Sequence, residues 1–176
     1  MTERGVRSAL VITASDGAAT GAREDTSGAG VADRLAELGY AVERLVIRDD
    51  RAAIENALIE GGSRHALVVT TGGTGLTPRD VTPQATLAVI DYEVPGLAEA
   101  MRAAGRVTTP FADLSRGVVG VRGRTLIVNL PGSPKGALES LEAIAGVLEH
   151  ALDTLAGPYD HGVTPVEPAA PREPTA

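Results

Sequence analysis

The chain has 176 residues, of which 43% are hydrophobic and 22% are charged, and it carries a formal net charge of −7. No apolar run approaches the roughly 18 residues that span a bilayer, and no charged segment followed by an apolar stretch opens the chain, so we expect a cytoplasmic protein without a membrane partner. The acidic charge and an aromatic content of 2% argue against nucleic acid as a partner. The absence of cysteine excludes disulfides, thiolate metal sites and cysteine nucleophiles.

The first part of the chain alternates between strand and helix patterns. Residues 8–13 predict a buried strand, and residues 18–24 predict a loop. The capping side chains of residues 25–27 then precede a helix that ends at Gly39. The next elements in chain order are a strand over 41–47, a helix that ends at Gly61 and Gly62, and a buried strand over 66–69.

The second part of the chain adds an antiparallel strand. We expect short helices over 83–89 and 96–104, the second after a break at residues 92–95. Two strand patterns over 118–122 and 125–129 then predict a hairpin, and a long amphipathic helix follows it. The short connections indicate parallel strands with helices on both faces. The predicted fold class is therefore α/β, with a mostly parallel central sheet and one antiparallel strand.

The end of the chain differs in composition from the rest. From residue 157 onward, five prolines in 20 residues and few large apolar groups predict a flexible tail. We expect one folded domain over 1–157 and a proline-rich tail over 158–176. The three histidines lack metal-ligand spacing and are interpreted as surface or packing residues. They are His65, His150 and His161.

The segment 66–83 is the most informative about function, because a buried strand there ends in a loop rich in glycine and threonine. At the carboxyl end of a strand, glycines let an anion approach backbone N–H groups, and threonines add hydroxyls. These residues are Thr71, Gly72, Gly73, Thr74 and Gly75. The chain has no Gly-Lys pair of a Walker A loop, and Pro78 stands where a dinucleotide fingerprint needs Gly or Ala. The loop therefore predicts a phosphate site of another kind, with an ordinary strand-to-helix turn as the alternative.

An acidic residue follows this loop. Asp80 precedes Thr82 and Pro83, which predict a helix with Thr82 as its N-cap. Two interpretations of Asp80 remain open: the carboxylate holds Mg²⁺ against phosphate oxygens, or it is a first-turn acid that suits the helix dipole.

Three further loops at the carboxyl ends of predicted strands carry polar residues. They contain Ser15 and Asp16, Asp49 and Asp50, and Gly132, Ser133 and Lys135. Such loops gather at one edge of an α/β sheet, where a crevice forms. Helix capping is the alternative for the aspartates and for Ser133. Taken together, a glycine cradle, carboxylates and a lysine suit phosphoryl or nucleotidyl transfer.

Seven segments that occur in order resemble the molybdopterin-binding family. They are residues 12–16, 25–28, 70–75, 79–83, 95–102, 114–116 and 129–136. The resemblance covers about residues 5–157 and is greatest for the stand-alone bacterial Mog and MoaB proteins, although longer molybdenum-insertion proteins and proteins of the CinA type share the fold. It implies a three-layer α/β/α domain that assembles as a homotrimer or a larger homo-oligomer.

The resemblance also implies molybdopterin adenylyltransferase activity in molybdenum cofactor biosynthesis. ATP and molybdopterin would react with Mg²⁺ to give adenylylated molybdopterin and pyrophosphate, with the molybdate-insertion enzyme as a candidate partner. Asp49 and Asp80 match the two family aspartates tied to catalysis and would hold Mg²⁺, while the choice between Asp49 and Asp50 stays open. The phosphate and nucleotide site would comprise Ser15, Asp16, Thr71, Gly72, Gly73, Thr74 and Gly75. The pterin and nucleotide pocket would comprise Glu99, Ser115, Arg116, Gly132, Ser133 and Lys135.

Two alternatives to this enzyme remain. One is a MoaB-like protein that binds the pterin, or a precursor, with weak or different chemistry. The other is a noncatalytic oligomeric carrier that stores or delivers the pterin.

Overall fold

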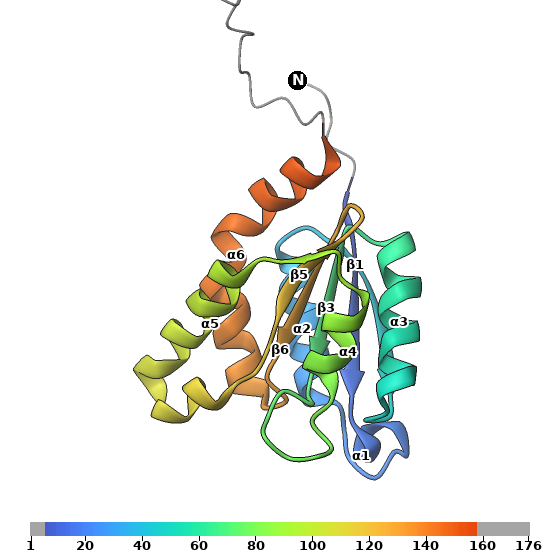
Figure 1. Ribbon diagram of the computed structural model, residues 1–176, viewed down its shortest axis with the longest axis vertical. Helices are drawn as coiled ribbons and strands as arrows, with labels where there is room; N and C mark the ends of the chain where they lie inside the picture. The colour runs from blue at the N-terminus through green and yellow to red at the C-terminus, as the bar shows by residue number, and fades with distance from the viewer. Residues whose placement is uncertain (1–5, 158–176) are drawn as a thin grey trace, which may run out of the picture.

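A computed structural model describes residues 6–157, and in this range the chain forms one six-stranded sheet in the order β2-β1-β3-β6-β5-β4 (Figure 1). The strands are β1 (Ser8–Ala14), β2 (Ala41–Ile47), β3 (Leu67–Thr71), β4 (Tyr92–Glu93), β5 (Val119–Arg122) and β6 (Thr125–Leu130). The helices are α1 (Asp16–Ala19), α2 (Thr26–Glu37), α3 (Arg51–Arg64), α4 (Thr82–Val89), α5 (Pro95–Thr108), the 3₁₀ helix η1 (Pro110–Leu114) and α6 (Pro134–Ala156).

The sheet is mostly parallel. Strands β2, β1, β3 and β6 pair in parallel, with Val11 opposite Val69 and Val69 opposite Val128. Strand β5 pairs antiparallel with both β6 and β4, so β5 alone among the described strands runs against the others. This arrangement confirms the predicted α/β fold class with one antiparallel strand.

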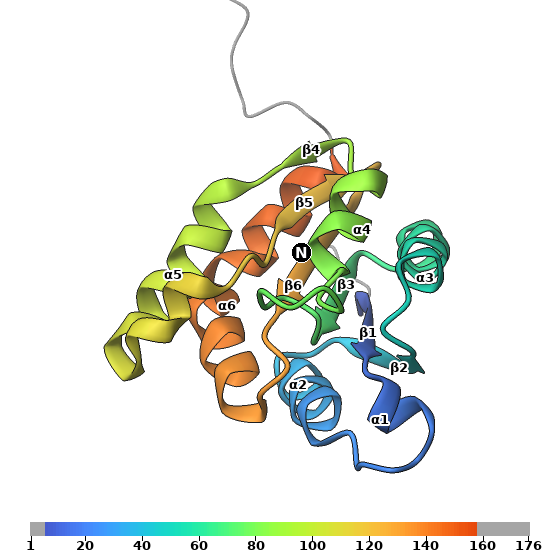
Figure 2. The same ribbon diagram turned by 60° about the horizontal axis from the view of Figure 1, so that its bottom comes forward.

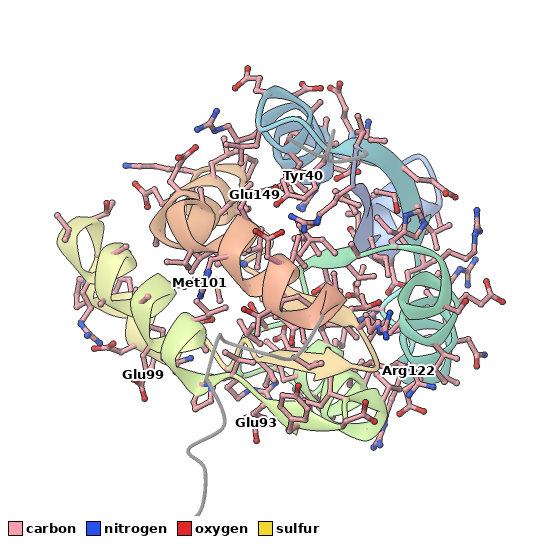
Figure 3. The ribbon with its side chains drawn as sticks, turned by 90° about the horizontal axis from the view of Figure 1, so that it is seen from above. Tyr40, Glu93, Glu99, Met101, Arg122 and Glu149 are labelled. Carbon is pink, nitrogen blue, oxygen red and sulfur yellow. The ribbon has the colours of Figure 1, made fainter. Side chains whose placement is uncertain are left out.

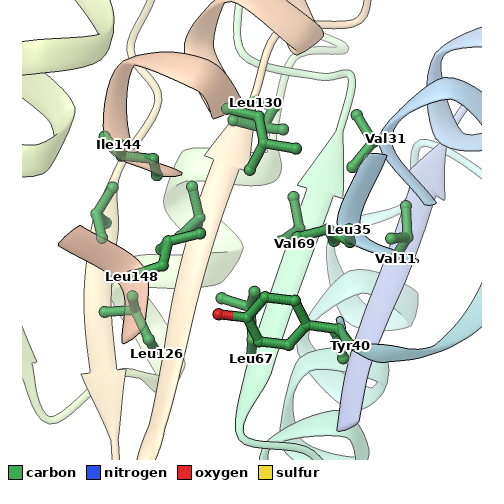
Figure 4. Packing of buried hydrophobic residues seen from close by; sticks show 14 of the residues in the cluster. Val11, Val31, Leu35, Tyr40, Leu67, Val69, Leu126, Leu130, Ile144 and Leu148 are labelled. Carbon is green, nitrogen blue, oxygen red and sulfur yellow. The ribbon is translucent and has the colours of Figure 1, made fainter. Parts of the chain in front are cut away.

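Helices cover both faces of the sheet, with α2, α5 and α6 on one face and α3 and α4 on the other (Figure 2). Successive strand residues point to opposite faces, which divides the core into two clusters. Val11 and Val69 pack under α2 and α6, together with the ring of Tyr40 (Figure 4). Leu10 and Ile12 pack against α3 and α4 on the other face. Every residue of β3 is buried, which explains its continuous apolar run.

Two helix starts differ from the sequence-based expectation. Residues 18–24 were expected to form a loop, but Ala18 and Ala19 belong to the short helix α1, whereas residues 20–24 form no helix or strand. Ser15 caps α1, since its Oγ accepts a hydrogen bond from the N–H of Ala18 at 3.3 Å. The prediction of Thr82 as an N-cap is wrong by one residue. Val81 occupies the N-cap position of α4 without a side-chain hydrogen bond, and Thr82 and Pro83 lie inside the helix.

Other differences arise from contacts between distant elements. Helix α3 continues past Gly61 to Arg64. Gly61 does not end the helix but lets it pack closely on the sheet, because a Cβ at this position would lie 2.7 Å from Cδ2 of Leu10 on β1. Tyr92 and Glu93, expected only to interrupt a helix, form β4 and pair with β5. Helix α5 extends beyond residue 104 to Thr108, and η1 was not predicted.

The described part of the chain ends just after α6, whose last residue is Ala156. The proline-rich tail predicted over 158–176 lies outside the described residues. Within residues 6–157, no helix is both long enough and apolar enough to cross a membrane.

Candidate functional site

A cleft of ≈ 740 Å³ opens at the carboxyl ends of β1 and β3. This is the lower end of the molecule in Figure 1, where α1 and the loop between β3 and α4 lie. The cleft is lined by Thr13, Ala14, Ser15, Ala18, Arg23, Glu24, Asp25, Thr26, Ser27, Asp49, Thr71, Gly72, Gly73, Arg79, Asp80, Gly132, Ser133 and Pro134. Because these residues come from the loops after β1, β2, β3 and β6, the predicted convergence of loops is present in the fold.

The glycine loop begins with a backbone conformation that only glycine adopts easily. Gly72 has a φ of +94°, and a Cβ at this position would lie 2.4 Å from the carbonyl oxygen of Ala14. Its N–H donates to the carbonyl of Leu130 at 3.3 Å. Gly72 therefore lets the loop cross between the ends of β1 and β6.

Asp80 is anchored by the loop that precedes it. Its Oδ2 accepts hydrogen bonds from the N–H of Thr77 at 2.8 Å and from the Oγ1 of Thr77 at 2.6 Å. Burial acts to raise the pKa of Asp80, but the hydrogen bonds from Thr77 and Gly75 and the positive charge of Arg116 outweigh it, so the pKa is lowered. Asp80 is therefore a carboxylate at neutral pH.

Asp49 occupies a different electrostatic environment. Its Oδ2 accepts from the N–H of Asp16 at 3.1 Å, and its own N–H donates to Oδ1 of Asp16 at 3.3 Å. Burial and repulsion from Asp80 raise the pKa of Asp49. Asp50 is exposed and caps α3, accepting from the N–H of Ala53 at 2.8 Å. Of the two neighbouring acids, Asp49 is the one that lines the cleft.

The donor set in the cleft fits a cation that is shared with a substrate. Among the described residues, no group of three or more His, Cys, Asp or Glu side chains is arranged to hold a metal. Asp49 and Asp80 offer carboxylate oxygens in one cleft, and the repulsion between them would fall if a cation bound there. Mg²⁺ is commonly held by one or two carboxylates plus phosphate oxygens and waters. The pair is therefore suited to Mg²⁺ bound together with a phosphate ligand.

The residues expected to contact phosphate divide into three groups. Four of them line the cleft: Ser15, Thr71, Gly72 and Gly73. Gly75 lines a second, neighbouring cleft. Asp16 and Thr74 line neither: the carboxylate of Asp16 forms an ion pair with Arg79, and Thr74 is buried.

The second cleft, of ≈ 300 Å³, lies between α5, η1 and the start of α6. Its walls include apolar side chains such as Met101, which lies between α5 and α6 (Figure 3), and Phe111. Of the residues expected in a pterin pocket, Ser115 lines this cleft and Ser133 lines both clefts. The two clefts are therefore adjacent, with Ser133 between them.

The other residues expected in the pterin pocket have different positions. Gly132 lines the first cleft. Arg116 holds the glycine loop, because its Nε donates to the carbonyl of Gly75 at 2.7 Å and its Nη2 to the carbonyl of Asp80 at 2.6 Å. Lys135 is exposed and lies 3.7 Å from a carboxylate oxygen of Glu139. Glu99 is exposed on α5 (Figure 3), and neither Glu99 nor Lys135 lines the two clefts.

Sequence reasoning missed several side chains of the first cleft: Thr13, Arg23, Asp25, Ser27 and Arg79. Residues 25–27 were interpreted only as helix caps, and Asp25 does cap α2 by accepting from the N–H of Gly28 at 2.8 Å. The segment 25–28 was also among the matching family segments, which was the available signal for a further role.

The histidines are consistent with packing and surface positions where the structure describes them. His65 is largely buried, with its Nε2 3.4 Å from a carboxylate oxygen of Glu43. His150 is exposed on α6, and His161 lies outside the described residues.

The fold and the cleft define an α/β/α protein with a candidate phosphate site at the carboxyl edge of its sheet. The chain belongs to the family described as the probable molybdopterin binding domain, whose model matches residues 10–150. This result confirms the resemblance found in the sequence.

Relatives of known name support this assignment. A molybdopterin adenylyltransferase of Helicobacter pylori J99 is 40% identical over 156 residues, which cover 85% of this chain and 88% of the relative. A solved structure of the molybdopterin biosynthesis enzyme MoaB from Thermus thermophilus is 48% identical and has a TM-score of 0.79. The match covers 88% of this chain and 100% of the Thermus chain. The Mog protein of Mycobacterium ulcerans is 45% identical, with a TM-score of 0.81 and coverage of 85% and 99%.

Proposed function

We propose that this chain is a Mg²⁺-dependent molybdopterin adenylyltransferase, which transfers AMP from ATP to the terminal phosphate of molybdopterin and releases pyrophosphate. The observation that carries this proposal is the pair Asp49 and Asp80 in one cleft beside the glycine loop. Asp80 is held as a carboxylate, while Asp49 has a raised pKa that a bound cation would lower. The name of the Helicobacter relative supports the same reaction.

The reaction is a displacement at the α-phosphorus of ATP. An oxygen of the molybdopterin phosphate forms a new bond to this phosphorus while the bond to the β-phosphate oxygen breaks, and pyrophosphate carries the bonding electrons away. No general base is required, because the attacking phosphate is already ionised near neutral pH. Mg²⁺ held by Asp49 and Asp80 would neutralise charge on the phosphates.

The remaining contribution of the protein is to hold the two substrates next to each other. The first cleft, with its glycine loop and the cations Arg23 and Arg79, suits the triphosphate. The second cleft, with more apolar walls, suits the pterin rings. Because Ser133 lines both clefts, the acceptor phosphate and the α-phosphate would meet near this residue.

Replacing Asp80 by asparagine tests the proposal. Asp80→Asn keeps an oxygen for the hydrogen bonds from Thr77 but removes the charge that would hold Mg²⁺. We expect pyrophosphate release from ATP, Mg²⁺ and molybdopterin to fall on the order of a hundredfold or more, as when one preorganised electrostatic element is lost. The matched control is Asp50→Asn, since Asp50 is exposed and lies outside both clefts. Near-normal release by Asp80→Asn would restrict Asp80 to a structural role.

A MoaB-like function is the second candidate, because the MoaB structure from Thermus thermophilus is as similar to this chain as the Mog structure is. Such a protein would bind the pterin but release little or no pyrophosphate. A noncatalytic carrier would bind it equally well after loss of both Asp49 and Asp80. Measuring pterin binding and pyrophosphate release on the same samples separates the three functions.

A further inference from the structure

Four polar side chains form a hydrogen-bonded chain in the wall of the first cleft, on the side of the sheet that α2 covers. Thr13 Oγ1 donates to Oδ2 of Asp25 at 2.9 Å, and Thr71 Oγ1 donates to Oγ1 of Thr13 at 3.4 Å. The Oγ of Ser27 lies 3.3 Å from the Oγ1 of Thr71. All four residues line the cleft, and Ser27 is only 9% exposed. Ser27 is thus a largely buried residue in the wall of the ligand space.

Asp25 is fixed as an acceptor at one end of this chain. Its Oδ2 also accepts from Nη2 of Arg44 at 2.7 Å, and its Oδ1 accepts from the N–H of Gly28 at 2.8 Å. A carboxylate with these partners cannot donate. Thr13 must therefore direct its only hydroxyl hydrogen toward Asp25.

This constraint sets the direction of every other bond in the chain. Because the hydrogen of Thr13 is used, Thr71 donates its hydrogen to Thr13 and accepts on its other side. Ser27 must then donate to Thr71. The hydroxyl of Thr71 has no hydrogen left for a phosphate oxygen, and the oxygen of Ser27 presents only lone pairs to the cleft.

The backbone keeps this chain in place. Helix α2 approaches it so closely that a Cβ at position 28 would lie 2.1 Å from Oγ1 of Thr13 and 2.4 Å from Oδ2 of Asp25. Only glycine fits there, which gives a physical reason for glycine directly after Asp25, Thr26 and Ser27. The segment therefore builds one wall of the cleft in addition to capping a helix.

We propose that Ser27 accepts a hydrogen bond from the nucleoside end of ATP, and that Asp25 is a positioning residue that acts on Ser27 through Thr13 and Thr71. The inference rests on the proposed adenylyltransferase function and adds the orientation of the nucleotide. A phosphate group is an acceptor, so it is disfavoured beside the lone pairs of Ser27 and the carboxylate of Asp25. The donors that a nucleoside offers are the amino group of adenine and the ribose hydroxyls.

Nucleotide analogues that each lack one donor test this proposal. They also distinguish the amino group of adenine from the ribose hydroxyls as the group that donates to Ser27. Purine riboside triphosphate lacks the amino group, and 2′-deoxy-ATP and 3′-deoxy-ATP each lack one hydroxyl. We expect the full chain with Mg²⁺ to bind one of these analogues roughly three- to tenfold more weakly than ATP by calorimetry, the range typical of one neutral hydrogen bond. Ser27→Ala should bind ATP only as tightly as the wild type binds that analogue, and the difference in affinity between ATP and the analogue should disappear. Ser8→Ala, at the opposite end of β1, is the matched serine control and should keep the difference.

A second pair of variants tests the action of Asp25 at a distance. Thr13→Val keeps the shape of Thr13 but breaks the chain between Asp25 and Thr71, so the hydroxyls of Thr71 and Ser27 become free to reverse. We expect the discrimination between ATP and the sensitive analogue to shrink, and Thr13→Ser to restore it. A purely structural role of Thr13 would change the melting temperature without changing this ratio of affinities.

Two results would overturn the inference while leaving the proposed function intact. One is equal binding of ATP and all three analogues by the wild-type chain. The other is an analogue penalty that persists at full size in Ser27→Ala. If the wild-type chain binds no adenine nucleotide at all, the proposed function fails first, and the orientation inferred from it fails as well.

Discussion

At the scale of single residues, Asp49 and Asp80, two of the acidic residues that line the first cleft, have pKa values shifted in opposite directions. Asp80 has a lowered pKa because the hydrogen bonds from Thr77 and Gly75, with the charge of Arg116, outweigh its burial. Asp49 has a raised pKa because of burial and the negative charge of Asp80. Ionisation of Asp49 without a cation is therefore less favourable in the folded protein than in the unfolded chain, and perturbed carboxyl groups of this kind are common at functional sites.

This difference predicts a stabilising substitution that damages function. The raised pKa of Asp49 means that its ionisation costs stability as pH rises above about 3.8, the value for the unfolded chain. Asp49→Asn should raise the melting temperature at pH 7 by roughly one to three degrees and should have little effect near pH 3. Mg²⁺ with ATP should raise the melting temperature of the wild type more than that of the variant. A lower melting temperature for Asp49→Asn at pH 7 would contradict the repulsion from Asp80.

Asp25 predicts the opposite pH dependence. Burial acts to raise its pKa, but Arg44, the N–H of Gly28 and the hydroxyl of Thr13 outweigh this effect and lower it. The ionised form of Asp25 therefore stabilises the fold above the unfolded value of about 3.8, and this contribution is lost as pH falls through the lower folded value. Asp25→Asn should cost about 2 kcal/mol at pH 7, because the charged hydrogen bond from Arg44 is lost while asparagine can still cap α2. Urea titrations should show the two proteins converging toward pH 3, and a constant difference would exclude this ionisation as the cause.

At the scale of elements, the loop between β3 and α4 depends on a side chain from a distant segment. The side chain of Arg116 donates to the carbonyls of Gly75 and Asp80 at 2.7 and 2.6 Å. The backbone N–H of Arg116 donates to the carbonyl of Thr74 at 3.0 Å. The segment after η1 therefore fixes the shape of the loop that carries Asp80. This arrangement explains why Arg116, expected in the ligand pocket, lines neither cleft.

Replacing Arg116 should loosen this loop before it affects the rest of the fold. Arg116→Ala removes two charged hydrogen bonds, and we expect a loss of about 2 to 4 kcal/mol in the free energy of unfolding. Hydrogen exchange of residues 74–80 should accelerate more than exchange in β1 or β3. The control is Arg51→Ala, whose exposed ion pair with Glu55 should contribute less than about 1 kcal/mol. Unchanged exchange in residues 74–80 would show that Arg116 does not hold the loop.

At the scale of the whole molecule, assembly remains a prediction. Several apolar side chains near the end of α5 and in η1 are exposed, notably Val107 at 89% and Phe111 at 74%. Exposed apolar groups of this size are typical of surfaces that contact other chains. We expect a homotrimer of about 54 kDa in light scattering, three times the 18.0 kDa of one chain. A single species of 18.0 kDa at micromolar concentration would contradict this prediction.

The sequence by itself determined the fold class, the glycine loop and the family. These depend on patterns within a few residues: the buried run of β3, the glycines that follow it and the cap before α2 are read from neighbours in the chain. The sequence-based predictions were wrong where a residue contacts a partner that lies far away in the chain. Gly61 looked like a helix end but admits packing against Leu10, and Tyr92 looked like a break but pairs with Val121.

Only the tertiary structure decided which side chains share the cleft. It placed Asp49 beside the ligand space and Asp50 at the start of α3, although the two acids are adjacent in sequence. It also joined Asp25 through Thr13 to Thr71, which lies more than forty residues further along the chain. The physical reason is that local sequence governs backbone conformation, whereas the partner of a side chain depends on how strands far apart in sequence pair in the sheet.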